Sequence, residues 1–382
     1  MAARPAGPAH NSILLRHIEY LDADFVWKQG DILLTGDRIT AIDAPSAITA
    51  EAAEQIIEGQ SLRLYPGLID LHTHGAVGSD TMDATTEGLE KISRFLAVNG
   101  TTAFLATSMS SDRQSLEHVF RQPPSVSGAA ILGYHMEGPF LNSAKAGAMD
   151  PRHLRRPDIS ELRQYQHIRR ITVAPEMDGA LEFIRLLTEE TGIKVSLGHT
   201  VADYQTGLAA FAQGAQSLTH LYNAMPPLLH RDPGIIAAAI DSGAAAELIS
   251  DGFHVHPAMV RVAWKLFGSQ RLALISDAMR ATGLADGTYD LGGQTVYVRQ
   301  GEARLADGHI AGSTVTLWQC LHRAHAAGIP LQDAARMASA TPAELLGEAD
   351  ERGRIRKGLR ADLILADGSS IRQVWIGGQA VL

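Results

Sequence analysis

Eight short apolar runs, each followed by a stretch of helix length, recur through the middle of this 382-residue chain. The runs lie at 64–71, 102–107, 130–136, 171–174, 194–197, 217–219, 247–249 and 272–276. In the stretch ALEFIRLLTEETG, apolar residues such as Phe183, Ile184 and Leu187 share one helical face before Gly192. Eight strands alternating with helices over about 250 residues are what a closed (β/α)8 barrel requires. We therefore predict an α/β fold with a (β/α)8 TIM barrel, and a doubly wound open sheet is the alternative.

The two ends of the chain have a different pattern from the middle. Both ends alternate short apolar stretches with turn signals, as in DILLTGDRITAID near the start and ADLILADGSSIRQVWIGGQAVL at the end. Gly36-Asp37 and Gly377-Gly378 are typical of tight hairpin turns. We predict that residues 1–64 and 351–382 form one small β-sandwich domain beside a barrel of residues 65–350. A glycine-rich alternating segment at 287–312 predicts an excursion of hairpins after the eighth strand.

Composition limits the partners of this protein. The formal net charge is −9 without a run rich in Lys or Arg, so nucleic acid and anionic membranes are not expected partners. A single cysteine, Cys320, excludes an intrachain disulfide. The start MAARPAGPAHNS is small and polar, and no window reaches the ~18 apolar residues of a membrane span. We expect a cytoplasmic protein that acts on a small molecule.

Polar side chains gather at the ends of five of the apolar runs. In a closed parallel barrel, all carboxyl ends open onto one face, where active sites of this fold lie. Each residue alone has an ordinary structural explanation, such as helix capping by an aspartate. Together they form a set of imidazoles and carboxylates that suits Zn²⁺, Fe²⁺ or another first-row metal, and not Ca²⁺ or Mg²⁺. The predicted ligands are His72, His74, Glu137, His199, His220 and Asp277.

Successive sequence strings resemble the signatures of one enzyme family. They are PGLIDLHTHG, GYHMEGPFLN, ITVAPE, LGHT, THLYNAMPPLLHRDPG, DGFHVHP and ISDAM, in this order from about residue 64 to residue 314. The chain resembles the N-acetylglucosamine-6-phosphate deacetylases of the amidohydrolase superfamily, and its β-rich ends match the accessory domain of that family. The resemblance implies hydrolysis of N-acetylglucosamine-6-phosphate to glucosamine-6-phosphate and acetate.

The resemblance also implies roles for the predicted metal ligands. Glu137, His199 and His220 would bind the principal metal ion. His72 and His74 match the members with an intact His-x-His, in which a second ion is bridged by Glu137. Asp277 would complete that second position and act as the catalytic acid/base. One or two divalent ions per subunit are implied, with zinc or iron as the metal.

Four residues would bind the substrate according to the same resemblance. Asn223 and Ala224 would contact it next to the metal. Arg231 would hold the phosphate, for which a planar guanidinium is well suited; a surface ion pair with Asp232 is the ordinary alternative. His254 would reach the phosphate from the neighbouring subunit of a homodimer.

One position departs from the family pattern. A His-Asn usually follows the KxG element after the third strand, but here the string is KAGAMD, with Met149 at the histidine position. A thioether cannot donate the same hydrogen bond to a sugar. The substrate could therefore be a related N-acetyl compound of a specialised or natural-product pathway.

Two further readings compete with the deacetylase. Dihydroorotase-like or cytosine-deaminase-like amidohydrolases often use a carbamylated lysine after the fourth strand, where this chain has Ala174-Pro175-Glu176. A non-catalytic barrel scaffold would be expected to lose metal ligands, yet all six positions are filled here.

Overall fold

The computed structural model describes residues 11–121 and 126–381 of the chain, so the predicted polar start at residues 1–10 lies outside the described residues. Eight parallel strands form one sheet in the order of the chain. They are β6 (Leu68–Thr73), β9 (Thr101–Ser108), β10 (Ala130–Glu137), β11 (Ile168–Val173), β12 (Lys194–Leu197), β13 (Ser217–Leu218), β14 (Ala245–Ile249) and β15 (Leu272–Ile275).

The first and last strands of this sheet close it into a ring. Thr73 forms a parallel bridge with Ala278, and the backbone N–H of Asp277 donates to the carbonyl of His72 at 2.9 Å. The predicted (β/α)8 barrel is therefore confirmed, and the open sheet is excluded.

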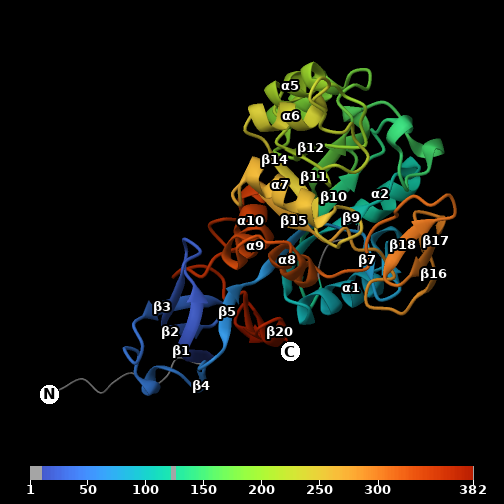
Figure 1. Ribbon diagram of the computed structural model, residues 1–382. Helices are drawn as coiled ribbons and strands as arrows, with labels where there is room; N and C mark the ends of the chain where they lie inside the picture. Colours follow the sequence, from blue (N-terminus) through green and yellow to red (C-terminus); the bar gives the residue numbers. More distant parts are fainter. Residues whose placement is uncertain (1–10, 122–125, 382) are drawn as a thin grey trace.

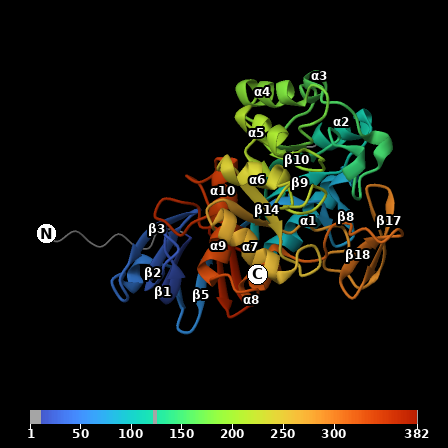
Figure 2. The ribbon, with the colours of Figure 1, turned by 45° about the horizontal axis from the view of Figure 1, so that its top comes forward.

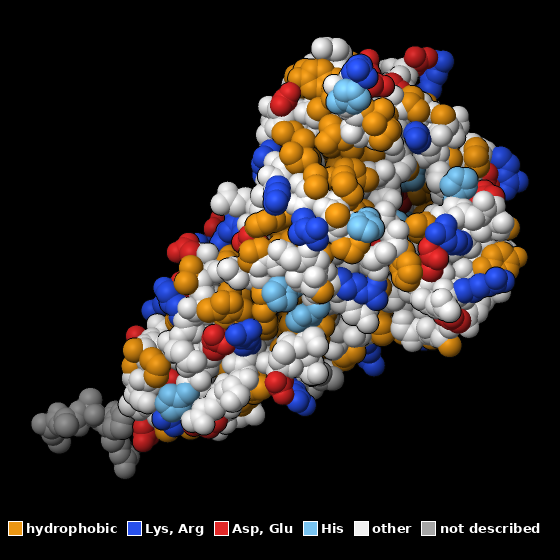
Figure 3. All heavy atoms as spheres, in the orientation of Figure 1, with side chains coloured by type: hydrophobic (Ala, Val, Ile, Leu, Met, Phe, Trp, Pro, Cys, Tyr) orange, Lys and Arg blue, Asp and Glu red, His pale blue; other side chains and the backbone are white. Residues whose placement is uncertain are grey.

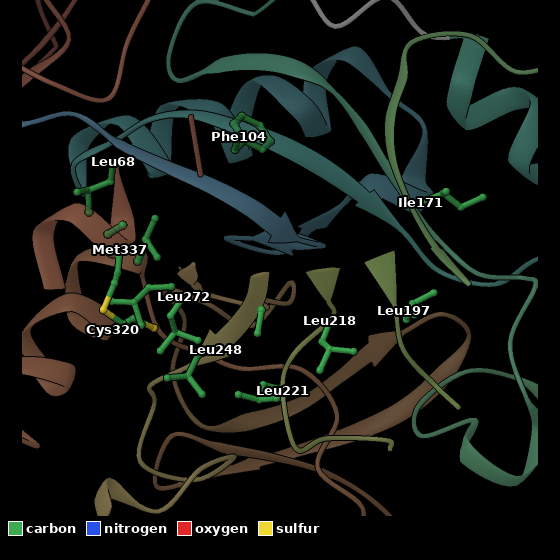
Figure 4. Close-up of a cluster of buried hydrophobic side chains, with 14 of the residues drawn as sticks. Leu68, Phe104, Ile171, Leu197, Leu218, Leu221, Leu248, Leu272, Cys320 and Met337 are labelled. Atoms are coloured by element: carbon green, nitrogen blue, oxygen red, sulfur yellow. The ribbon is translucent and has the colours of Figure 1, made fainter. Parts of the chain in front are cut away.

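Helices surround the ring of strands in both ribbon views (Figures 1 and 2). They are α1 (Thr86–Val98), α2 (Arg113–Arg121), α3 (Ile159–Leu162), α4 (Ala180–Glu190), α5 (Tyr204–Ala212), α6 (Gly234–Asp241), α7 (Pro257–Phe267), α8 (Leu317–Ala326), α9 (Leu331–Ala338) and α10 (Ala340–Leu346). Their apolar faces pack on the barrel: Leu68 and Leu272 from the strands lie with Cys320 of α8 and Met337 of α9 in one buried cluster (Figure 4). No described helix is both long and apolar enough to cross a membrane.

The predicted run 64–71 is wrong as a single strand. The structure divides it at Gly67 into β5 (Arg63–Pro66) and β6. β5 pairs with strands of the terminal sheet, whereas β6 pairs with β9 in the barrel. A Cβ at Gly67 would lie only 2.3 Å from the Thr102 hydroxyl oxygen, so this close approach of two chain segments requires glycine.

Both ends of the chain build a second sheet, which projects from the barrel at the lower left of Figure 1. Its strands are β1 (Ser12–Leu21), β2 (Trp27–Thr35), β3 (Arg38–Asp43), β4 (Gln55–Glu58), β5, β19 (Leu363–Asp367), β20 (Ser370–Ile376) and β21 (Gln379–Ala380). The sheet curls back on itself: Arg38 at the start of the edge strand β3 forms a bridge with Arg360, just before β19 in the middle of the sheet. Its faces enclose a core that includes Ile32, Leu363 and Trp375. The predicted small β domain from both termini is confirmed.

A three-stranded excursion follows the eighth barrel strand, as predicted for 287–312. It consists of β16 (Gly287–Leu291), β17 (Gln294–Arg299) and β18 (Glu302–Leu305) in antiparallel order. A short hairpin of β7 (Gly75–Ala76) and β8 (Ser79–Asp80) follows β6. Leu291 and Val296 of the excursion pack on Met149 and Met279, which joins the excursion to the loops at the carboxyl ends of the barrel strands.

Candidate metal centre and substrate cavity

The side chains predicted to bind metal meet at the carboxyl end of the barrel. Each lies at the carboxyl end of a strand or within two residues after the strand. His72 is in β6 and His74 follows it; Glu137 ends β10; His199, His220 and Asp277 follow β12, β13 and β15. All six side chains are buried. The structure thus brings together residues that are up to 205 positions apart in the sequence (72 to 277).

One oxygen of Glu137 faces two histidines. Glu137 Oε1 lies 3.2 Å from Nε2 of His199 and 3.0 Å from Nε2 of His220. The two Nε2 atoms are themselves 3.0 Å apart. Three potential ligand atoms therefore surround one point, and we call these residues the first group.

The other oxygen of Glu137 faces the second group, formed by His72, His74 and Asp277. His74 Nε2 lies 3.3 Å from both Glu137 Oε2 and Asp277 Oδ1. His72 Nε2 lies 3.3 Å from His74 Nε2 and 3.4 Å from Glu137 Oε2. Glu137 consequently stands between two groups of ligand atoms, each compact enough for one ion.

The donor atoms fit divalent metal. Two nitrogens bound to one tetrahedral zinc ion at 2.0–2.1 Å are about 3.3 Å apart, close to the separations found here. The Lys145 carbonyl accepts a hydrogen bond from Nδ1 of His199 at 2.8 Å. In the neutral ring this leaves a lone pair on Nε2 that faces a Glu137 oxygen, and a cation between these two acceptors relieves their repulsion.

The charges of the cluster also favour a cation. Burial lowers the pKa of His74, but hydrogen bonds and charges from Asp277 and Glu137 outweigh burial and raise the pKa to about 9. The same balance raises the pKa of His72 well above its usual value. The carboxylates thus attract positive charge to this point, whether it is carried by protons or by metal.

Four of the predicted site residues have left-handed backbone conformations that non-glycine residues rarely adopt. The φ angles are +48° at His199, +31° at His220, +49° at Ala224 and +49° at Asp277. Such a conformation costs on the order of 1–3 kcal/mol per residue and persists where the surroundings impose it, commonly at functional sites. The strain at three predicted ligands is consistent with a site built for ligand geometry rather than for stability.

A cavity of about 410 Å³ opens above the two groups. Its floor contains side chains of both groups, and its walls come from the loops after the barrel strands and from the excursion. Asn223 and Ala224 line it, as predicted for substrate contacts, and so does Met149. This volume accommodates a small-molecule substrate next to the ligand atoms.

His254 lies in the wall of the cavity of its own chain, together with His74 and Asp277. That it also serves the site of a neighbouring subunit stays a prediction. Asp251, which follows β14, holds the ring in place: its carboxylate accepts hydrogen bonds from the backbone N–H of His254 at 2.8 Å and from the ring Nδ1 at 2.7 Å. Burial lowers the pKa of His254, but the Asp251 carboxylate outweighs burial and raises it.

Arg231 is exposed on the loop between β13 and α6 and is not among the residues that line the cavity. The structure thus separates it from the other predicted substrate residues. Neighbouring apolar side chains are exposed as well, with 36% of Leu228 and 51% of Leu229 accessible to solvent.

Sequence reasoning missed several residues of the site. Lys145, whose carbonyl holds His199, acts through its backbone and leaves no sequence signal. His309 lies in the cavity wall although no role was predicted for it. Arg170 and Glu247 are fully buried charges inside apolar strands, and a charge within such a run is a signal that could have drawn attention to them.

Comparisons with known proteins agree with this site. Residues 63–381 match the model of the Amidohydrolase family. The chain is 39% identical to the N-acetylglucosamine-6-phosphate deacetylase of Vibrio furnissii, over 93% of this chain and 92% of that protein. It is 34% identical to the N-acetylgalactosamine-6-phosphate deacetylase of Escherichia coli O157:H7, over 92% and 95% of the two chains.

A solved structure shows the same architecture. It is a mutant of N-acetyl-D-glucosamine-6-phosphate deacetylase from Mycobacterium smegmatis in complex with N-acetyl-D-glucosamine-6-phosphate. It is 33% identical, has a TM-score of 0.89, and the match covers 97% of this chain and 99% of that one. Together with the sequence comparisons, this likeness shows that the chain belongs to the amidohydrolase family and, within it, to the N-acetylglucosamine-6-phosphate deacetylases.

Proposed function

We propose that this protein hydrolyses the N-acetyl group of N-acetylglucosamine-6-phosphate and releases glucosamine-6-phosphate and acetate. The observation that carries the proposal is the pair of ligand groups joined by Glu137 on the floor of a cavity of substrate size. Amide hydrolysis requires an activated water, stabilisation of a tetrahedral oxyanion and a proton for the amine, and this arrangement can supply all three.

The first group would hold the principal ion through Glu137, His199 and His220. The second group would hold a further ion through His72, His74 and Asp277, with Glu137 shared between them. The mixture of imidazole and carboxylate ligands supports zinc or iron. When bound, such an ion would act as a Lewis acid toward the acetyl carbonyl and the attacking water.

Asp277 is the proposed acid/base. Burial raises the pKa of its carboxyl, but His72 and His74 outweigh burial and lower the pKa to about 2. Asp277 is therefore ionised at neutral pH and can accept the proton of the attacking water. It lines the cavity beside Glu137, where it can pass that proton to the departing amine nitrogen.

His254 is a proposed phosphate ligand, either for the cavity of its own chain, which it lines, or for that of the neighbouring subunit of a dimer. Its ring is oriented by Asp251 through Nδ1, which leaves Nε2 free to donate toward an anion when the ring is protonated. Asn223 and Ala224 would contact the substrate near the ions. Arg231 remains a proposed second phosphate ligand; from its exposed position it can serve only if its loop closes over the cavity or if it enters the cavity of a second subunit.

A homodimer is part of the proposal. Exposed apolar side chains offer surface for a second copy. They are Leu228 and Leu229 beside Arg231, and Phe253 and Met259 near the start of α7. Figure 3 shows hydrophobic side chains gathered on the face that lies over α6 and α7. A cytoplasmic location stays a prediction from the sequence.

A second candidate substrate is favoured by Met149. Its side chain is 3% exposed, lines the cavity and accepts a hydrogen bond at Sδ from the backbone N–H of Ser110 at 3.3 Å. Met149 therefore presents an apolar, non-donating surface to the sugar, which supports a different N-acetyl amino sugar or a related N-acetyl compound. The deacetylase of Escherichia coli named above bears a different sugar in its name.

Release of acetate from a panel of N-acetyl amino sugars, each with and without a 6-phosphate, tests both candidates. We expect the highest kcat/KM with a phosphorylated N-acetylhexosamine and loss of turnover on chelation. Efficient turnover of N-acetylglucosamine-6-phosphate would exclude the second candidate, and no turnover of any N-acetyl sugar would refute the proposed function.

A further inference from the structure

A buried ion pair crosses the interior of the barrel behind the second group. Arg170 in β11 and Glu247 in β14 are both 0% exposed, and Arg170 Nη2 lies 2.8 Å from Glu247 Oε1. Neither residue lines the proposed substrate cavity. A buried ion pair generally stabilises a fold no better than well-packed apolar residues of similar size. This pair therefore calls for a role other than stability.

The second oxygen of Glu247 faces the metal ligands. Glu247 Oε2 lies 3.4 Å from Nδ1 of His72 and 3.4 Å from the backbone N–H of His220, which donates to it. An ionised carboxylate only accepts hydrogen bonds, so Nδ1 of His72 must carry the proton. In the neutral ring, Nε2 then has the free lone pair, and Nε2 is the atom that faces His74 and Glu137.

The cluster of His72, His135 and Glu247 is compact enough to hold an ion, but its other contacts argue against one. Both ring nitrogens of His135 have partners: Nδ1 lies 3.1 Å from the Leu71 carbonyl and Nε2 lies 2.8 Å from the Thr172 hydroxyl. Arg170 already supplies a positive charge to Glu247. This cluster is therefore a support for the ligands above it rather than another metal site.

We propose that Glu247, held in place by Arg170, is a positioning residue that fixes His72 as a ligand of the second ion. Hydrogen-bonded partners of this kind orient a metal-binding imidazole and increase its basicity. The inference rests on the proposed metal centre and assigns the imidazole contact of Glu247 to the second group. Among the described residues, Glu247 meets the first group through the backbone N–H of His220 and not through a ring nitrogen, so the first ion should be held without it.

Zinc binding tests the proposal without any measurement of turnover. The wild-type protein and Glu247→Gln are each dialysed against buffers of fixed free Zn²⁺, and zinc per chain is measured by mass spectrometry. We expect two ions in the wild type, and a dissociation constant for the second ion that is about 10–100-fold higher in Glu247→Gln. The first ion should bind with unchanged affinity.

Glu161→Gln is the matched control. Glu161 is a buried carboxylate that pairs with Arg113 and Arg155 away from the cavity. Its loss should also lower stability, because it leaves Arg113 and Arg155 without their buried carboxylate, but it should leave both ions in place. A purely structural role for Glu247 would give the two variants the same zinc content.

A double variant guards against failure of Glu247→Gln to fold. Arg170→Met with Glu247→Met removes both charges together, which buried pairs usually tolerate, and it should also lose the second ion. Two tightly bound ions in either Glu247 variant, or only one ion in the wild type, would overturn the inference. A wild-type protein without zinc would instead refute the proposed metal centre itself.

Discussion

Nε2 of His74 lies 3.3 Å from Oδ1 of Asp277, so a carboxylate and an imidazole from opposite ends of the barrel sequence share one ligand group. Replacement Asp277→Asn keeps the shape of this side chain but removes its charge and its ability to accept a proton. We expect kcat to fall about 10²–10⁴-fold, whereas the ion of the first group stays bound. Steady-state kinetics and zinc content check this, and a near-normal kcat would contradict the acid/base role.

Met149 should decide which sugar the cavity prefers. Replacement Met149→His restores a side chain that can donate a hydrogen bond to a hydroxyl, which is worth about 1 kcal/mol, or about fivefold in kcat/KM. We expect this increase for N-acetylglucosamine-6-phosphate relative to the preferred substrate of the wild type. Met149→Leu retains an apolar wall and serves as the control with unchanged preference. An equal effect of both variants on all sugars would show that position 149 does not select the substrate.

His254 should act on phosphorylated substrates alone. For His254→Asn we expect KM to rise about tenfold or more with a 6-phosphate, because a charge-assisted hydrogen bond is lost, and little change without phosphate. His256→Asn is the control: His256 is exposed and its ring caps α7 by accepting from the backbone N–H of Ala258, a role that asparagine also fulfils. Equal losses with both kinds of substrate would argue against a phosphate contact.

Glu161 should make stability depend on acid pH. Burial raises the pKa of its carboxyl, but Arg155 and Tyr165 outweigh burial and hold the pKa below its usual 4.5. The ionised group therefore stabilises the fold above the pKa of the unfolded chain, and this contribution is lost as the pH falls through the lower folded value. Glu161→Gln should reduce the free energy of unfolding by about 1–3 kcal/mol at pH 7. Urea unfolding should show the difference shrinking below pH 4.5; a constant difference down to pH 3 would contradict it.

Cys320 should be inert in the folded protein. Its thiol lies in the barrel core among residues of α8, α9 and the strands (Figure 4), and burial raises its pKa. A thiol reagent such as DTNB should react with less than about one-tenth of the chains at pH 8 in native buffer, because the thiolate is the reactive form. It should react with one thiol per chain in urea, since the sequence contains one cysteine. Rapid native labelling would show that α8 opens readily.

The fold was predictable because its signals are local. Apolar runs separated by amphipathic stretches identified the barrel strands, and Gly36-Asp37 and Gly377-Gly378 identified two hairpins that the structure contains. The run 64–71 was misread because β5 and β6 are both apolar and lie end to end. What separates them is a close approach between Gly67 and Thr102, a contact between distant segments that no local pattern records.

The site was predictable where strand ends fix direction. His72, Glu137 and Asp277 converge because parallel strands present their carboxyl ends to one face. That His254 lines the cavity of its own chain was not predicted, since its position depends on the bond from its ring to Asp251 and on the path of the loop. Arg231 shows the same limit, because a recognisable string does not say whether its loop folds over its own cavity.

The first and last strands of the ring are joined by a bridge between Thr73 and Ala278 and by hydrogen bonds that include the one from the Asp277 N–H to the His72 carbonyl. That seam is also where the second group lies, with two histidines on one side of it and an aspartate on the other. An ion held there would link the first and last strands of the barrel. Loss of that ion would then weaken both catalysis and the closure of the barrel.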